Sequence, residues 1–157
     1  MEARMKHPVM ILPDALDALL GVSKVARKGR LVPLTTMQMI DLRASQINGC
    51  SYCVDMHSRE LKQDGVKDEK IWGVGAWRES PHFNDAERAA LALTEAVTRL
   101  ADRPDPVPDD VWNDAARHYD EKALSAMLIE IAQINVWNRL NAATKQMAAT
   151  VEATASV

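Results

Sequence analysis

Both cysteines of the chain and one of its four histidines lie in the stretch Ser45-Gln46-Ile47-Asn48-Gly49-Cys50-Ser51-Tyr52-Cys53-Val54-Asp55-Met56-His57. We expect Gly49 to end one helix and Cys50 to begin the next. Because each helical residue turns by about 100°, Cys50, Cys53 and His57 would then fall within an arc of roughly 60°. The spacing therefore predicts two thiols and an imidazole on one face of a helix.

These residue types favour redox chemistry. The thiolate is the reactive form of cysteine, and both a helix N-terminus and a neighbouring base promote its formation. A second thiol three residues along can capture an oxidised first sulfur as a disulfide. Peroxide reduction by a dithiol follows directly from this pairing. Two alternatives stay open at this point, a zinc site and two buried cysteines without chemistry, although Cys50, Cys53 and His57 supply only three of the four ligands usual for structural zinc.

The residues from Arg43 to His57 closely resemble the alkylhydroperoxidase (AhpD-like) branch of the carboxymuconolactone decarboxylase family. The resemblance covers roughly residues 10–147. Its further segments are Gly75-Ala76-Trp77-Arg78-Glu79-Ser80-Pro81, Glu87-Arg88-Ala89-Ala90-Leu91-Ala92-Leu93 and Ile134-Asn135-Val136-Trp137-Asn138-Arg139-Leu140-Asn141. The decarboxylase branch typically lacks the cysteine pair, so its presence here argues against that activity.

The resemblance implies a role for each residue of the motif. It makes Cys53 the peroxidatic cysteine, Cys50 the resolving cysteine and His57 part of a proton relay. The relay of the family usually includes a glutamate twelve residues before the first cysteine, and this chain has Gln38 there. An amide cannot carry a proton as a carboxylate does. Asp41, one turn further along the same expected face, could take the place of that glutamate, or Gln38 could orient a water.

The replacement of the family glutamate keeps a second function open. A dithiol oxidoreductase or redox sensor would use the same disulfide without fast peroxide chemistry, and a metal-binding or purely structural oligomer is a third class. A peroxidase would need a hydroperoxide substrate and a dithiol reductant. The sequence has no Gly-rich phosphate loop, and we expect no cofactor beyond the two thiols.

Composition narrows the class of protein further. The chain has 157 residues, 47% of them hydrophobic, which is the size of one domain with a sizeable core. Its net charge of −3 is spread along the chain and gives no basic patch for nucleic acid or an anionic membrane. We find no apolar run of membrane-spanning length and no signal peptide, so we expect a cytoplasmic protein. In that compartment a cysteine pair is more often catalytic or metal-binding than structural.

Apolar residues at helical spacing predict a chain of helices. We expect them at Pro13 to about Lys28, Leu34–Asn48, Cys50–Gln63, a short one near Asp68–Trp72, one after the capping signal Asn84-Asp85-Ala86-Glu87, Asp109–His118 and Glu121–Met147. No run alternates as a strand would, so the fold class is all-α. The resemblance implies a helical bundle that assembles as a homotrimer or homohexamer, with the cysteine helix near the subunit interface.

Two polar stripes accompany these helices. Gln38, Asp41, Ser45 and Asn48 recur along one helix. A solvated face is the common interpretation of such a stripe, but its position next to the cysteines strengthens the alternative of a functional role. Asn135, Asn138 and Asn141 recur on the last helix, where we favour interhelical hydrogen bonds over substrate binding. Between helices, three prolines in Arg103–Pro108 predict a surface loop.

Overall fold

The computed structural model describes residues 2–102 and 104–148, and within these ranges all regular structure is helical. This confirms the predicted all-α fold. The helices, with short 3-10 segments labelled η, are α1 (Pro8–Ile11), α2 (Pro13–Ala26), η1 (Lys28–Arg30), α3 (Leu34–Asn48), α4 (Ser51–Gln63), α5 (Asp68–Gly73), η2 (Val74–Ala76), α6 (Asp85–Thr98), η3 (Leu100–Asp102), α7 (Asp109–His118) and α8 (Glu121–Thr144).

Local signals account for most of the helix bounds. The bounds expected for α3 and α7 agree with the structure, and α6 begins with the predicted capping box between Asn84 and Glu87. The last helix is shorter than predicted because Lys145 adopts a left-handed conformation (φ 55°), which ends α8 at Thr144. The prediction missed α1, a single turn whose Val9 amide donates a hydrogen bond to His7 Nδ1 at 3.3 Å.

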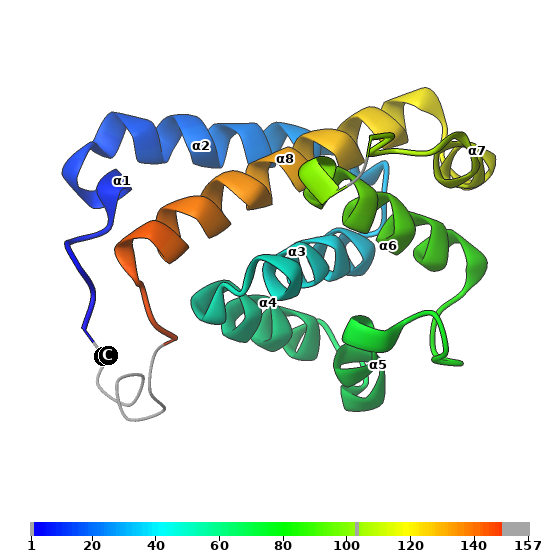
Figure 1. Ribbon diagram of the computed structural model, residues 1–157, viewed down its shortest axis with the longest axis horizontal. Helices are drawn as coiled ribbons and strands as arrows, with labels where there is room; N and C mark the ends of the chain where they lie inside the picture. Colours follow the sequence, from blue (N-terminus) through cyan, green and yellow to red (C-terminus); the bar gives the residue numbers. More distant parts are fainter. Residues whose placement is uncertain (1, 103, 149–157) are drawn as a thin grey trace.

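Helix α3 runs through the middle of the bundle (Figure 1) and contacts α4, α6 and α8. Every residue from Thr36 to Leu42 is buried, as are Ala44 and Ser45. A helix buried on all sides cannot be amphipathic in the usual sense. Its polar residues must therefore find partners on the helices around it.

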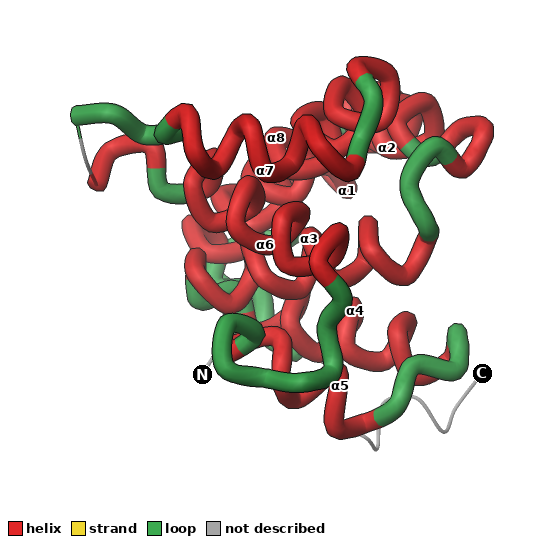
Figure 2. Tube along the Cα trace, turned by 90° about the vertical axis from the view of Figure 1, so that its right-hand side faces the viewer, coloured by secondary structure: helices red, strands yellow, loops and turns green. Residues whose placement is uncertain are grey.

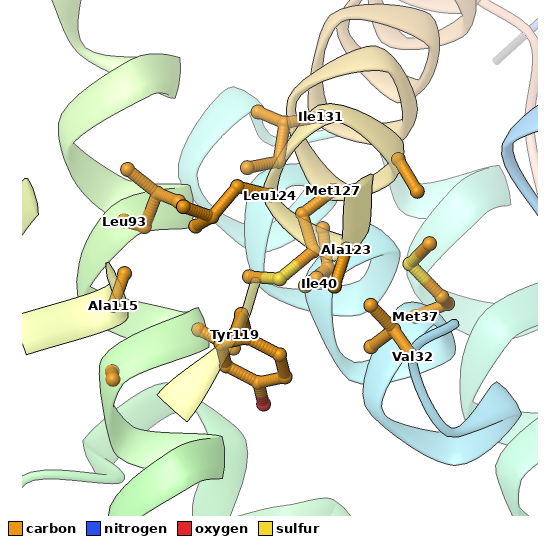
Figure 3. Packing of buried hydrophobic residues seen from close by; sticks show 13 residues of the cluster. Val32, Met37, Ile40, Leu93, Ala115, Tyr119, Ala123, Leu124, Met127 and Ile131 are labelled. Carbon is orange, nitrogen blue, oxygen red and sulfur yellow. The ribbon is translucent and has the colours of Figure 1, made fainter. Parts of the chain in front are cut away.

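Two hydrophobic clusters pack on different sides of α3. The first, shown in Figure 3, joins α3 to α6, α7 and α8. It includes Val32, Met37, Ile40, Ala89, Leu93, Ala115, Tyr119, Leu124, Met127 and Ile131. The second cluster joins α3 to α4, α5 and α6 and includes Met39, Leu42, Leu61, Ile71, Val74, Trp77, Phe83 and Leu91. Together they fix α3 against its neighbours and leave its remaining side to the polar residues.

The turn between α3 and α4 places the cysteines. Gly49 has φ 67°, a left-handed conformation in which a side chain would be strained, and it reverses the chain in one residue. Cys50 is the N-cap of α4, and its Sγ accepts a hydrogen bond from the Cys53 amide at 3.3 Å. In Figure 2, α2 and α8 lie in the upper layer, α3 beneath them, and α4 and α5 lower still. In the first turn of α4, Cys53 is buried, whereas Ser51 and Tyr52 are exposed.

Candidate active site

A cavity of about 340 Å³ lies between α2, α3, α4 and α8. This volume is at the small end of the range for small-molecule sites. Apolar and aromatic side chains form one part of the wall, namely Leu20, Tyr52, Met56, Ile134 and Trp137. Polar side chains and one sulfur form the rest, namely Ser23, Arg27, Asp41, Cys53, His57, Glu60, Glu130, Gln133 and Asn141. A small organic molecule in this cavity would thus contact both apolar side chains and ionisable groups.

The two cysteines differ in their access to this cavity. They form a disulfide, with Cα atoms 5.4 Å apart, and both are buried. Cys53 lines the cavity, whereas Cys50 caps the helix behind it and does not belong to the cavity wall. Asn141 of α8 donates a hydrogen bond from Nδ2 to Cys53 Sγ at 3.3 Å. Cys53 is therefore the sulfur that a molecule in the cavity would contact.

His57 lies one helical turn after Cys53 and also lines the cavity. Its Nδ1 is 2.8 Å from Glu60 Oε2 and 4.0 Å from Asp41 Oδ2. This hydrogen bond lowers the pKa of Glu60, so Glu60 is an ionised acceptor. In the neutral ring Nδ1 therefore carries the proton toward Glu60, and the lone pair is on Nε2, for which the described residues provide no partner. The geometry orients the ring as a base whose free nitrogen is available to a ligand or a thiol.

An arginine joins two carboxylates from different helices beside this histidine. Arg27 Nη2 donates to Asp41 Oδ2 at 2.5 Å and to Glu130 Oε1 at 2.7 Å, and Arg27 Nε donates to Glu130 Oε1 at 3.0 Å. The side chains of Asp41 and Glu130 are 0% and 3% exposed, that of Arg27 30%. Burial raises the pKa of Asp41 well above its usual range, and the Glu130 carboxylate raises it further, although Arg27 acts to lower it. Asp41 is thus a weak acid held beside His57.

The raised pKa of Asp41 predicts how stability depends on pH. Above about pH 4 the unfolded chain releases this proton while the folded chain retains it, so the free energy of unfolding falls as pH rises toward the folded pKa. Asp41→Asn keeps the shape and removes the titration. We expect the variant to gain stability relative to the natural chain between pH 4 and pH 7 in urea unfolding. A stability difference that is constant with pH would contradict the raised pKa.

The structure brings together three of the five predicted site residues, Cys53, His57 and Asp41, at the cavity wall. Cys50 is bonded to Cys53 just behind the wall. Gln38 lies elsewhere. It is buried, and its Nε2 donates to Asp64 Oδ2 at 2.6 Å, at the far end of α4. A glutamate at this position would set two carboxylates against each other, which explains why an amide is favoured there.

The interpretation of the α3 stripe as a solvated face is wrong for three of its four residues, whereas Asn48 at the end of the helix is exposed. Gln38, Asp41 and Ser45 are buried, because α4 and α8 cover this side of α3. The asparagines of α8 provide the matching polar groups. Asn48 Nδ2 donates to Asn135 Oδ1 and Asn138 Oδ1, both at 2.9 Å, and Asn138 Nδ2 donates to Ser45 Oγ at 3.0 Å. Asn135 and Asn138 thus make the predicted interhelical hydrogen bonds.

Four residues of the site escaped sequence reasoning or were assigned differently. Asn141 was expected to bridge helices, but its amide reaches Cys53. Glu60 follows His57 by three residues on the same helix, a spacing that could have identified it. Arg27 and Glu130 stand 14 and 89 residues from Asp41 in sequence, and Glu130 is set among the core-facing residues of α8. Only the folded chain shows that they meet.

Among residues 2–102 and 104–148, no three His, Cys, Asp or Glu side chains are arranged to hold a metal ion. In the same part of the chain, every helix is too short or too polar to span a membrane.

The all-α fold and the paired cysteines at a cavity wall define a helical protein with a dithiol site. The chain belongs to the carboxymuconolactone decarboxylase family, whose model matches residues 13–96. Two uncharacterised bacterial proteins are similar in sequence. YdfG of Bacillus subtilis is 32% identical over 88% of this chain and 92% of its own length. YnjA of Escherichia coli is 30% identical over 78% of this chain and 65% of its own length.

Solved structures support the AhpD-like resemblance. A protein of unknown function from Agrobacterium tumefaciens, considered a candidate antioxidant defence protein AhpD, has a TM-score of 0.88 and 30% identity, covering 95% of this chain and 99% of that one. The debrominase Bmp8 has a TM-score of 0.81 and 26% identity, covering 93% of this chain and 77% of that one. A cysteine-to-alanine variant of Bmp8 has been solved in complex with 2,3,4-tribromopyrrole.

Proposed function

We propose that this protein is a thiol-dependent peroxidase that reduces organic hydroperoxides with the Cys50–Cys53 pair. One observation carries the proposal: Cys53 is at the cavity wall, its partner sulfur is directly behind it, and a histidine with a free Nε2 lines the same cavity. A nucleophile, a resolving thiol and a base are the three groups that this chemistry requires. The likeness to an AhpD-type protein supports the same activity.

The proposed reaction begins from the reduced protein. His57 Nε2 takes the proton of the Cys53 thiol, and the thiolate attacks the outer oxygen of ROOH. The O–O bond breaks, Cys53 becomes a sulfenic acid, and the alkoxide takes the proton from His57 to leave as ROH. The Cys50 thiol then attacks the sulfenic sulfur, its proton joins the departing hydroxide as water, and the disulfide forms. Two electrons and two protons pass from the dithiol to the peroxide.

The second half of the cycle restores the thiols. An external dithiol attacks the disulfide, and its own oxidation to a disulfide returns two electrons and two protons to Cys50 and Cys53. A cytoplasmic location suits this step, because that compartment keeps thiols reduced.

Steady-state turnover tests the proposal. With dithiothreitol as reductant, we expect the protein to convert cumene hydroperoxide to cumyl alcohol, catalytically in protein. A redox sensor would instead form its disulfide once per chain without turning over at a comparable rate. Turnover no faster than dithiothreitol alone would contradict the peroxidase assignment and favour the sensor.

Reductive debromination is a second candidate, favoured by the likeness to Bmp8 together with the aromatic wall formed by Tyr52 and Trp137. The same dithiol could convert an aryl bromide to the arene and HBr while it forms the disulfide, which balances two electrons and two protons. Supplying 2,3,4-tribromopyrrole in place of the hydroperoxide separates the two. Bromide release that is faster than alcohol formation would favour debromination.

The contact between Asn141 and Cys53 gives a further prediction. The Asn141 amide donates to the sulfur, and hydrogen bonds to charged groups contribute about 1.5–3 kcal/mol, so it should stabilise the Cys53 thiolate. We expect Asn141→Leu to slow alkylation of the reduced protein by iodoacetamide about tenfold at pH 7. Asn135→Leu, from the same helix but without a contact to sulfur, is the control. Equal alkylation rates for the two variants would show that the Asn141 amide does not stabilise the Cys53 thiolate.

We also infer a homo-oligomer, a trimer or hexamer as the family resemblance implies. Apolar side chains exposed on the first two helices and at the junction between them support an interface there, namely Met10, Ile11, Leu12, Leu20 and Val25. A monomer in light scattering at micromolar concentration would contradict this inference.

A further inference from the structure

Two buried carboxylates at the site depend on one cation. Asp41 of α3 and Glu130 of α8 are almost fully buried, and both bond the guanidinium of Arg27 from α2. Glu60 of α4, which lines the same cavity, already bonds His57. One positive charge can balance only one of the two buried carboxylates. A second unbalanced anion in this dry environment would be costly, and such groups normally hold a proton instead.

The remaining oxygens point to the same conclusion. Asp41 Oδ1 and Glu130 Oε2 are buried and have no hydrogen-bond partner as ionised groups. The two carboxyl groups nevertheless lie side by side, because Asp41 Oδ2 and Glu130 Oε1 accept from the same Arg27 Nη2, at 2.5 and 2.7 Å. Two ionised carboxylates offer only lone pairs and repel, whereas one proton between them turns the contact into a hydrogen bond.

We propose that Asp41 and Glu130 share a single proton, that Asp41 carries it, and that this acid pair sets the charge that faces His57. Arg27 makes two hydrogen bonds to Glu130 and one to Asp41, so the negative charge is better stabilised on Glu130. Asp41, with no exposed surface, takes the proton and donates it to Glu130. Glu130 is then a positioning residue that acts on His57 through Asp41.

The consequence for the histidine rests on the proposed function, whereas the shared proton does not. Asp41 Oδ2 is 4.0 Å from His57 Nδ1. With Asp41 neutral, Glu60 is the one ionised carboxylate that bonds this ring. If Asp41 were ionised as well, two anions would hold the imidazolium, and it would release its proton to a leaving alkoxide less readily. The acid pair therefore keeps His57 able to both take and give a proton.

Infrared spectroscopy tests the shared proton without reference to activity. At pH 7 we expect the natural chain to show the C=O stretch of a protonated carboxylic acid. Asp41→Asn should lose this band because the acid is gone. Glu130→Gln should lose it because Arg27 then pairs with Asp41 alone and Asp41 ionises. A natural chain without the band, or with a band that persists in both variants, would overturn the proposal.

NMR titration of the His57 ring in the reduced protein shows which member holds the proton. Asparagine resembles a protonated aspartic acid, so Asp41→Asn should leave the midpoint of the His57 titration nearly unchanged. Glu130→Gln places a full charge on Asp41 and should raise that midpoint by about one pH unit or more. A lowered midpoint in Asp41→Asn with no change in Glu130→Gln would mean that Asp41 is the ionised member.

These outcomes are separable from the fate of the peroxidase proposal. If the band and the titration behave as expected but the natural chain does not turn over hydroperoxide, the acid pair stands and the proposed function fails. If turnover is present and the band is absent, the reverse holds. If Arg27, Asp41 and Glu130 formed only a structural salt bridge, neither the infrared band nor the midpoint of the His57 titration would change in the stated directions.

Discussion

Cys53→Ser is expected to lower hydroperoxide consumption by at least about a thousandfold, because the variant lacks the nucleophile that begins the reaction. Cys50→Ser should behave differently. Its Cys53 still faces the cavity and reacts once, but no second thiol is present to form the disulfide. The reaction then stops at a sulfenic acid. The asymmetry follows from the structure, in which only one of the two sulfurs belongs to the cavity wall.

A dimedone-type reagent traps the sulfenic acid and measures this difference. We expect labelling of Cys50→Ser after one equivalent of cumene hydroperoxide and none of Cys53→Ser. The two variants are matched, since both sulfurs are buried and each variant replaces one cysteine at the start of α4 by serine. Helix electrostatics alone would favour the sulfur nearer the N-terminus. Labelling of Cys53→Ser and not of Cys50→Ser would therefore show that the two roles are reversed.

Arg27→Met should destabilise the protein by about 3 kcal/mol at neutral pH, as expected when one partner of a buried ion pair is removed. Methionine replaces much of the apolar stem of arginine but leaves Asp41 and Glu130 without their cation. Urea unfolding measures the change. The loss should shrink as pH falls, because Glu130, the ionised member of the pair, can then take up a proton.

Arg59→Met is the matched control for this change. Arg59 bonds Asp55 on the exposed surface of α4, where an ion pair contributes little. An effect of Arg27→Met no larger than that of Arg59→Met would show that Arg27 does not hold the two carboxylates together. A loss that does not change with pH would point to packing and not to charge.

Most of the fold could be predicted because its helix ends are encoded locally. Proline before Leu34 and glycine after Asn48 delimit α3, and the capping box starts α6. Lys145 carries no such signal. Its left-handed conformation ends α8 at Thr144. The type of a non-glycine residue does not reveal that it adopts this conformation.

Helical spacing could predict only site residues that lie on the same helix. Helical spacing placed Cys53 and His57 on a common face, and Asp41 was identified through its place relative to the family glutamate. The partners of Asp41 come from α2 and α8, and no periodicity connects Arg27 or Glu130 to it. The polar stripe on α3 was misinterpreted for the same reason. In the sequence, a polar stripe that faces water has the same residue spacing as one that faces asparagines of another helix, so the spacing cannot distinguish them.

The most direct test of the proposed peroxidase reaction is a single turnover of the reduced, oxygen-free protein with one equivalent of cumene hydroperoxide. Intact mass and peptide mapping report the state of the cysteines, and chromatography reports the alcohol. We expect one cumyl alcohol per chain. The protein should lose two hydrogens, and peptide mapping should assign this loss to a new Cys50–Cys53 disulfide. Unreacted hydroperoxide beside an intact dithiol would contradict the proposed reaction.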